Sequence, residues 1–121
     1  MSDLNSVILY VADVVRSEAF YANIFGRKAL ESSPGFALFA AAPNVKLGLW
    51  RADEVLPRAN PPGGVEVCLT EGSEAAVDAR HAAWTAKGVA IAQAPTRMDF
   101  GYTFVGLDPD GHRLRVFVPA Q

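Results

Sequence analysis

The chain has 121 residues, of which 50% are hydrophobic, and a formal net charge of −2. This length is typical of one domain, and the slight acidic excess argues against a nucleic-acid-binding surface or a basic membrane patch. No apolar run approaches the roughly 18 residues that a membrane span needs. The first residues lack the pattern of a secretory signal, and a single cysteine, Cys68, excludes an internal disulfide. We therefore expect a cytoplasmic protein.

The first half of the chain combines a strand, a helix and three further strands. The short β-branched segment Ser6–Val11 predicts a strand, and Asp13 is a favourable N-cap for the helix that follows. Gly26 provides a stop for that helix. The apolar runs beyond it predict three strands, over residues 27–32, 36–41 and 45–50.

A segment rich in proline and glycine interrupts this pattern, which then starts again. Glu66–Thr70 predicts a strand, and Ser73 and Gly88 are suited to begin and end a second helix. The remaining elements are a strand over 89–94, a loop over 95–99 and a hairpin around the turn Asp108–Gly111. We expect a first module at about 1–52, a linker at about 53–63 and a second module at about 64–121.

The two halves are similar to each other in sequence. The hairpin that ends the first half aligns with the hairpin that ends the second half if a shift of one residue is allowed. In this alignment Phe36 corresponds to Tyr102 and Trp50 to Phe117. Two copies of a βαβββ unit predict an α+β fold with eight strands. A ferredoxin-like fold also mixes strands and helices in two halves, but it has fewer strands in each half.

Particular segments of this pattern resemble a known family. The segments Val11–Asp13, Ser17–Tyr21 and Ile24–Gly26 resemble the first module of the vicinal oxygen chelate superfamily, and the Asp108–Gly111 hairpin resembles its last module. That superfamily includes glyoxalase I, extradiol dioxygenases, and fosfomycin and bleomycin resistance proteins. The short length and aromatic content are most similar to the small resistance proteins that bind drugs such as bleomycin or phenazines. The resemblance implies two βαβββ modules that form a cupped mixed sheet, with helices on the convex side, in a homodimer.

In enzymes of that superfamily, His, Glu or Gln side chains at four equivalent positions hold a divalent metal. Carried over to this chain, the positions fall on Ser6, Gly48, Glu66 and Arg115. Only Glu66 is a good ligand, because glycine offers no side chain and serine is a poor donor to transition metals. The fixed charge of Arg115 would oppose a cation by several kcal/mol at about 4 Å and an effective dielectric near 20. We therefore expect no metal and no cofactor, and we expect the chain to lack a catalytic residue.

Three other residues have reactive side chains. We expect His81 on a helix and His112 in the last hairpin turn, so neither lies in the cup. Cys68 stands between two apolar strand residues, which favours a buried, inert thiol over a nucleophile.

Strand alternation places a mixture of aromatic, charged and small residues on the face opposite the helices. Trp50 is suited to stack on a planar ring, and Gly48 leaves room beside it. Glu66 and Arg115 would either bind polar groups of a ligand or pair with each other. The complete candidate set for ligand binding is Trp50, Glu66, Arg115, Tyr10, Ser6, Gly48, Phe100, Tyr102, Phe117 and Cys68.

Several of these residues have an alternative structural interpretation. Trp50 and Phe117 would also serve to plug the cup or to line a dimer interface. Packing and cavity roles are equally open for Phe36 and Tyr102, whereas Phe100 lies on a loop suited to a lid.

The favoured hypothesis is a binding protein that sequesters a planar aromatic small molecule, such as an antibiotic, without a metal. The first alternative is a metal-dependent lyase, isomerase or dioxygenase with atypical ligands around Glu66. The second is a small interaction protein whose apolar cup serves only dimerisation.

Overall fold

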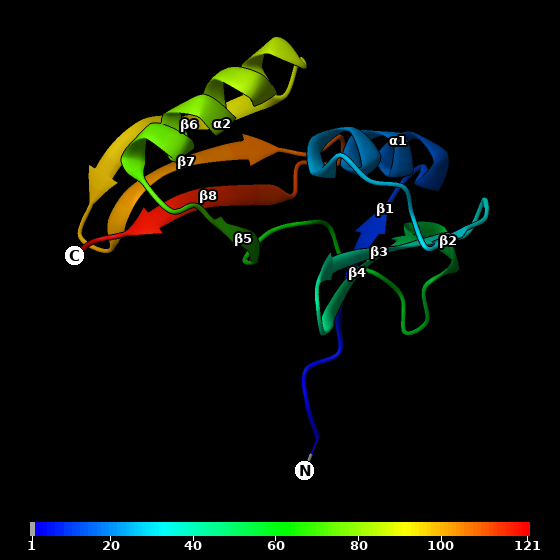
Figure 1. The fold of residues 1–121 in the computed structure, drawn as a ribbon. Helices are drawn as coiled ribbons and strands as arrows, with labels where there is room; N and C mark the ends of the chain where they lie inside the picture. The colour runs from blue at the N-terminus through cyan, green and yellow to red at the C-terminus, as the bar shows by residue number, and fades with distance from the viewer. Residues whose placement is uncertain (1) are drawn as a thin grey trace. The chain divides into compact units, whose positions relative to one another are not determined.

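A computed structural model describes residues 2–121, which form two units, one ending at Pro62 and the other running from Gly63 to Gln121 (Figure 1). Each unit contains one four-stranded mixed sheet and one long helix. The α+β class and the doubled βαβββ order predicted from the sequence are confirmed. Neither helix in this described part of the chain is long and apolar enough to cross a bilayer.

The first unit pairs its first strand with its last. Its strands lie in the order β1-β4-β3-β2, with β1 parallel to β4 and the other neighbours antiparallel. The elements are β1 (Ser6–Val11), α1 (Val14–Phe25), β2 (Glu31–Ser32), β3 (Phe36–Ala42) and β4 (Val45–Arg51).

The second unit repeats this topology. Its strands lie in the order β5-β8-β7-β6, and β5 runs parallel to β8. The elements are β5 (Glu66–Thr70), α2 (Glu74–Ala86), β6 (Ala90–Met98), β7 (Gly101–Leu107) and β8 (Arg113–Pro119).

Both helices begin where their caps predict. The side chain of Asp13 accepts a hydrogen bond from the Arg16 backbone N–H at 3.2 Å, and Ser73 Oγ accepts one from Ala76 at 3.0 Å. At the end of α1, Gly26 takes the left-handed conformation (φ 67°) that a residue without a Cβ adopts at low cost.

The core of each unit lies between its sheet and its helix. In the first unit, Leu49 of β4 is fully buried, and α1 packs against β3 and β4. In the second unit, α2 packs on β6, β7 and β8, and Trp84 meets Phe104 edge-on with ring centroids 5.3 Å apart. Trp84 is 2% exposed and therefore lies in the core of this unit.

Two strands differ from the prediction. The strand expected over 27–32 is reduced to Glu31–Ser32, because the N–H of Arg27 still bonds to the helix-terminal carbonyl of Ala22. The loop expected over 95–99 is largely strand, since β6 continues through Pro95 to Met98. A proline is tolerated there because β6 is an edge strand whose register shifts between Gln93 and Thr96.

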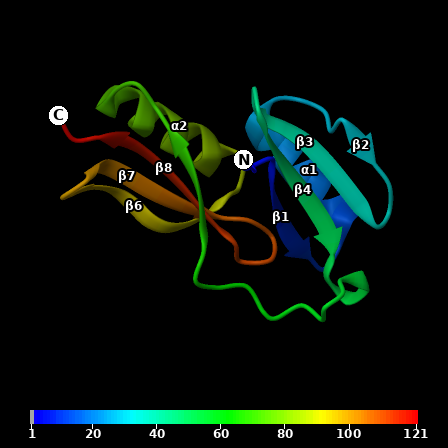
Figure 2. The same cartoon turned by 90° about the horizontal axis from the view of Figure 1, so that it is seen from below.

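The chain between β4 and β5 contains one short 3₁₀ turn, Ala52–Glu54, and then no helix or strand before Glu66 (Figure 2). The prolines and glycines of this segment account for the absence of a longer element. The turn itself was not predicted, and Arg51 stabilises it through an ion pair with Asp53 at 2.8 Å.

The contact between Trp84 and β7 depends on a glycine. A Cβ at Gly106 would lie 2.8 Å from Trp84 Cε3 and 3.1 Å from Val89 Cγ1. We predict that Gly106→Ala lowers the free energy of unfolding by about 1–3 kcal/mol, because the added methyl group overpacks the interface between helix and sheet. Urea unfolding measures this change.

Gly72→Ala is the matched control. A Cβ at Gly72 meets nothing within 4 Å, so this variant should change stability by less than about 1 kcal/mol. Equal effects of the two substitutions would contradict the packing argument.

Candidate functional site

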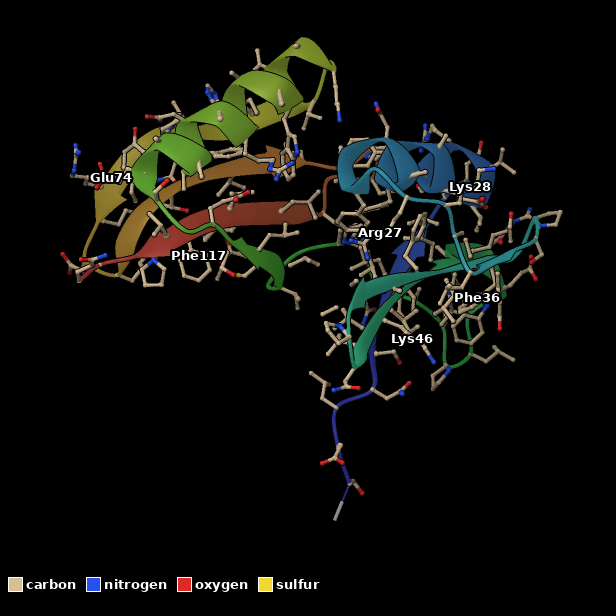
Figure 3. All side chains as sticks on the ribbon, in the orientation of Figure 1. Arg27, Lys28, Phe36, Lys46, Glu74 and Phe117 are labelled. Carbon is tan, nitrogen blue, oxygen red and sulfur yellow. The ribbon has the colours of Figure 1, made fainter. Side chains whose placement is uncertain are left out.

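Each sheet has one face turned away from its own helix, which we call the open face. Strand alternation places Ile8, Tyr10 and Trp50 on the open face of the first unit. The same alternation places Glu66, Cys68, Arg115 and Phe117 on the open face of the second unit. Figure 3 shows Phe117 on the side of β8 away from α2.

Arg115 is the centre of a polar cluster on the open face of the second unit. Its Nε donates to both carboxylate oxygens of Glu66, at 2.9 and 3.2 Å. Its Nη1 donates to Gln93 Oε1 at 3.1 Å and to Thr103 Oγ1 at 3.2 Å. The guanidinium carbon also lies 5.5 Å from the ring centroid of Phe100, within the range of a cation–π contact. We call these five residues the arginine cluster.

The cluster is well supported by the strands around it. Thr103 is fully buried and donates its own hydroxyl proton to the carbonyl of Val116 at 2.9 Å, so its oxygen accepts from Arg115 in a fixed orientation. The Arg115 side chain is only 15% exposed, against 32% for Glu66. The sequence left open whether Glu66 and Arg115 bind a ligand or each other. In the structure the two side chains are bonded to each other.

Phe100 and Phe117 form an aromatic edge beside the cluster. Their ring centroids lie 5.9 Å apart in an edge-on arrangement, and Phe100 is 43% exposed at the turn between β6 and β7. An exposed aromatic ring next to a guanidinium offers a surface on which a flat apolar group can pack.

Cys68 lies on the same open face, and its exposure differs from the expectation of a buried thiol. The thiol is exposed rather than buried, because β5 is an edge strand and Cys68 points away from α2. Partial burial raises the pKa of the Cys68 thiol, the charge of Glu66 raises it further, and Arg115 partly offsets both. A raised pKa favours the protonated thiol, which is the less nucleophilic form.

The open face of the first unit has an aromatic pair at one end of β1 and β4 and polar residues at the other. Tyr10 and Trp50 pair across β1 and β4 and meet edge-on, with ring centroids 6.3 Å apart. Ser6 lies further along β1, opposite Lys46. Tyr10 is 38% exposed and Trp50 is partly buried, so the two aromatic side chains are accessible from this face.

Gly48 does not leave the space that was expected beside Trp50. A Cβ at Gly48 would lie 2.5 Å from Ile8 Cδ1 and 3.2 Å from Phe36 Cζ, so two apolar side chains already cover this position. Gly48 is buried beneath them. The glycine therefore allows Ile8 and Phe36 to close over β4, instead of opening a cavity.

Tyr102 is not part of either open face. Its hydroxyl donates to Asp78 of α2 at 2.7 Å, and the guanidinium carbon of Arg97 lies 5.2 Å from its ring centroid. The hydrogen bond to Asp78 is the main cause of a raised Tyr102 pKa. The side chain thus braces the helix against the sheet and does not face Arg115.

The residues that sequence reasoning missed are Gln93 and Thr103. The strand registers pair Phe36 with Trp50 and Thr103 with Phe117, so Thr103 is the true counterpart of Phe36. The sequence match allowed a shift of one residue, and it therefore assigned Tyr102 as the counterpart of Phe36. Counting back from the Asp108–Gly111 turn along both strands of the hairpin would have identified Thr103.

The donors at the four metal-ligand positions do not fit a divalent ion. Glu66 supplies the only carboxylate, and both of its oxygens accept from Arg115. Ser6 stands opposite Lys46 in the strand register, and Gly48 has no side chain to offer. Within residues 2–121, no group of three or more His, Cys, Asp or Glu side chains is placed to hold a metal.

The electrostatics of the cluster lead to a test on Cys68. We predict that Glu66→Gln shifts the pH profile of Cys68 alkylation to lower pH, because it removes a negative charge that disfavours the thiolate. Arg115→Met should shift the profile to higher pH, because it removes the opposing cation. Rates with iodoacetamide across pH 7–10 measure both shifts, with Cys68→Ser as the unreactive control. An unchanged profile in both variants would show that neither charge acts on the thiol.

The chain matches proteins of known family along almost its whole length. The Glyoxalase/Bleomycin resistance protein/Dioxygenase superfamily matches residues 3–116. The phenazine antibiotic resistance protein EhpR of Enterobacter agglomerans is 30% identical over 115 residues, which cover 93% of this chain and 88% of the relative.

Solved structures share the fold of this chain. The solution structure of a protein from Agrobacterium tumefaciens is 44% identical, covers 100% of both chains and superimposes with a TM-score of 0.91. A glyoxalase-related enzyme from Fulvimarina pelagi superimposes with a TM-score of 0.86 at 18% identity, over 98% of this chain and 88% of the enzyme. Because the family match spans both βαβββ units, this chain belongs to the Glyoxalase/Bleomycin resistance protein/Dioxygenase superfamily.

Proposed function

We propose that this protein binds and sequesters a planar aromatic small molecule of the phenazine kind, without a metal and without a chemical step. The single observation that carries the proposal is the arginine cluster. A guanidinium held by Glu66, Gln93 and Thr103 occupies the position where metal-dependent relatives are expected to have a chelating carboxylate. Such a group binds polar acceptors and repels cations.

The aromatic side chains of both open faces support this proposal. Tyr10 and Trp50 in the first unit, and Phe100 and Phe117 in the second, provide edges and faces for a flat ring. Binding sites for organic ligands commonly combine apolar walls with a few polar anchors. The similarity to a phenazine antibiotic resistance protein favours this class of compound.

We also propose that the protein acts as a homodimer in the cytoplasm. The dimer follows from the family resemblance, and the exposed side chains of Leu30, Leu56 and Val65 offer apolar surface for contact between subunits. The single cysteine suits a reducing compartment.

Trp50 provides a direct test of ring stacking. Stacking contributes about 0.5–1.5 kcal/mol beyond burial, so Trp50→Leu should raise the Kd for phenazine by about 2- to 10-fold. Titration calorimetry measures the Kd. Trp84→Phe is the matched control, because Trp84 is 2% exposed beneath α2 and its removal should leave the Kd unchanged within about twofold.

Two results would count against the proposal. The first is the absence of binding heat for every planar aromatic compound tried. The second is an equal loss of affinity in the Trp50 and Trp84 variants, which would point to general destabilisation and not to contact with the ligand.

The metal-dependent alternative is decided separately. An ion that binds the folded protein at about a hundredfold excess over its Kd would add about 2.7 kcal/mol of stability. We predict no such stabilisation by Ni²⁺, Zn²⁺, Mn²⁺ or Fe²⁺. The only carboxylate of the donor set is that of Glu66, and both of its oxygens already accept hydrogen bonds from Arg115. Thermal unfolding with each ion and elemental analysis of the purified protein check this. A stoichiometric ion would revive the enzyme hypothesis.

A further inference from the structure

The arginine cluster leaves two donors of Arg115 unused. A guanidinium carries five N–H groups. Nε donates its single proton to Glu66, and Nη1 donates to Gln93 and Thr103. No residue of the described chain accepts a hydrogen bond from Nη2. Two N–H groups of a side chain that is only 15% exposed therefore remain for another partner.

These donors are held in place before any ligand arrives. Three hydrogen-bonding side chains fix the guanidinium plane, and Phe100 packs against it at 5.5 Å. An acceptor that reaches Nη2 therefore forms its hydrogen bonds with a side chain that is already ordered. The entropic cost of ordering Arg115 on binding is thereby avoided. The same ligand can lay an aromatic ring along the exposed edge of Phe100.

Glu66 determines which acceptors are favoured. Its carboxylate lies 2.9 Å from Nε of the same guanidinium, so the pair is electrically neutral as a unit. An anionic acceptor at Nη2 would be attracted by Arg115 and repelled by Glu66, and the repulsion offsets part of the attraction that has to compensate for removing the anion from water. A neutral acceptor gains the hydrogen bonds and meets no such repulsion.

The third charge to consider is Arg113, which pairs in register with Glu66 on the neighbouring strand. Its side chain is exposed, so water and salt screen its effect on a bound ligand. Arg113 therefore does not restore a strong preference for anions.

Building on the proposed function, we infer that the Arg115–Glu66 pair selects a planar aromatic ligand carrying a neutral hydrogen-bond acceptor, such as a carboxamide or quinone oxygen, over its carboxylate analogue. Arg115 supplies the donors, and Glu66 is the specificity-determining residue that disfavours anions.

The experiment compares three probes, phenazine, phenazine-2-carboxamide and phenazine-2-carboxylate, by titration calorimetry at pH 8. For the unaltered protein, the carboxamide should bind about tenfold or more tightly than phenazine, because hydrogen bonds to a charged donor are strong. The carboxylate should bind within about threefold of phenazine.

Substitutions then separate the two roles. Glu66→Gln keeps an acceptor for Nε and removes the charge, so it should tighten carboxylate binding by about tenfold or more and leave the carboxamide within about threefold. Arg115→Met should abolish the advantage of the carboxamide over phenazine, because it removes the donors at Nη2. Arg113→Gln is the charge-matched control, and it should change the carboxylate-to-carboxamide ratio by less than about threefold.

The outcomes distinguish this inference from the proposed function. If phenazine binds but the carboxylate binds the unaltered protein as tightly as the carboxamide, or if Glu66→Gln leaves their ratio unchanged, the inference is overturned and the proposed function stands. If none of the three probes binds, both are overturned. Glu66 is partly exposed on an edge strand, so Glu66→Gln is expected to fold. If this variant does not fold, the ratio of carboxylate to carboxamide affinity in the unaltered protein still tests the inference.

Discussion

The ion pair between Arg115 and Glu66 constrains everything else on the open face of the second unit. Separating the two opposite charges is costly, because the Arg115 guanidinium, whose side chain is only 15% exposed, would then lack its partner in a poorly solvated place. The hydrogen bonds of Arg115 to Gln93 and Thr103 add to this cost. Neither member of the pair is therefore readily available for another task. A ligand on this face therefore meets the intact Arg115–Glu66 pair, in which the unused donors are those of Arg115 Nη2.

The two repeated units have diverged at corresponding positions of this shared framework. The strand registers place Gly48 of the first unit at the position of Arg115 in the second, and Phe36 at the position of Thr103. In the first unit the glycine lets apolar side chains close over the sheet, whereas in the second a buried hydroxyl supports a cation. One topology thus carries an aromatic pair on the open face of one unit and a polar, hydrogen-bonding cluster on that of the other.

Local sequence signals predicted the framework well, and long-range relations predicted the site less well. The strand Ser6–Val11 and the caps Asp13 and Ser73 depend on neighbouring residues alone, and the structure confirms all three. The pairing of Arg115 with Gln93 depends instead on a hairpin register and on an irregular edge strand. Because side chains alternate between faces along a strand, an error of one residue moves a side chain to the wrong face. The placement of Tyr102 shows that error.

Family membership alone does not assign a function to this chain. A glyoxalase-related enzyme at 18% identity superimposes with a TM-score of 0.86, so the fold persists while most side chains change. On an open face, exchanging an anionic side chain for a cationic one alters the charge by two units. Arg115, at a position where relatives are expected to have an anionic chelator, makes such a change, and its Nε lies 2.9 Å from Glu66 Oε2. The inferred preference for uncharged polar groups depends on the neutrality of this pair and not on the overall charge of the chain.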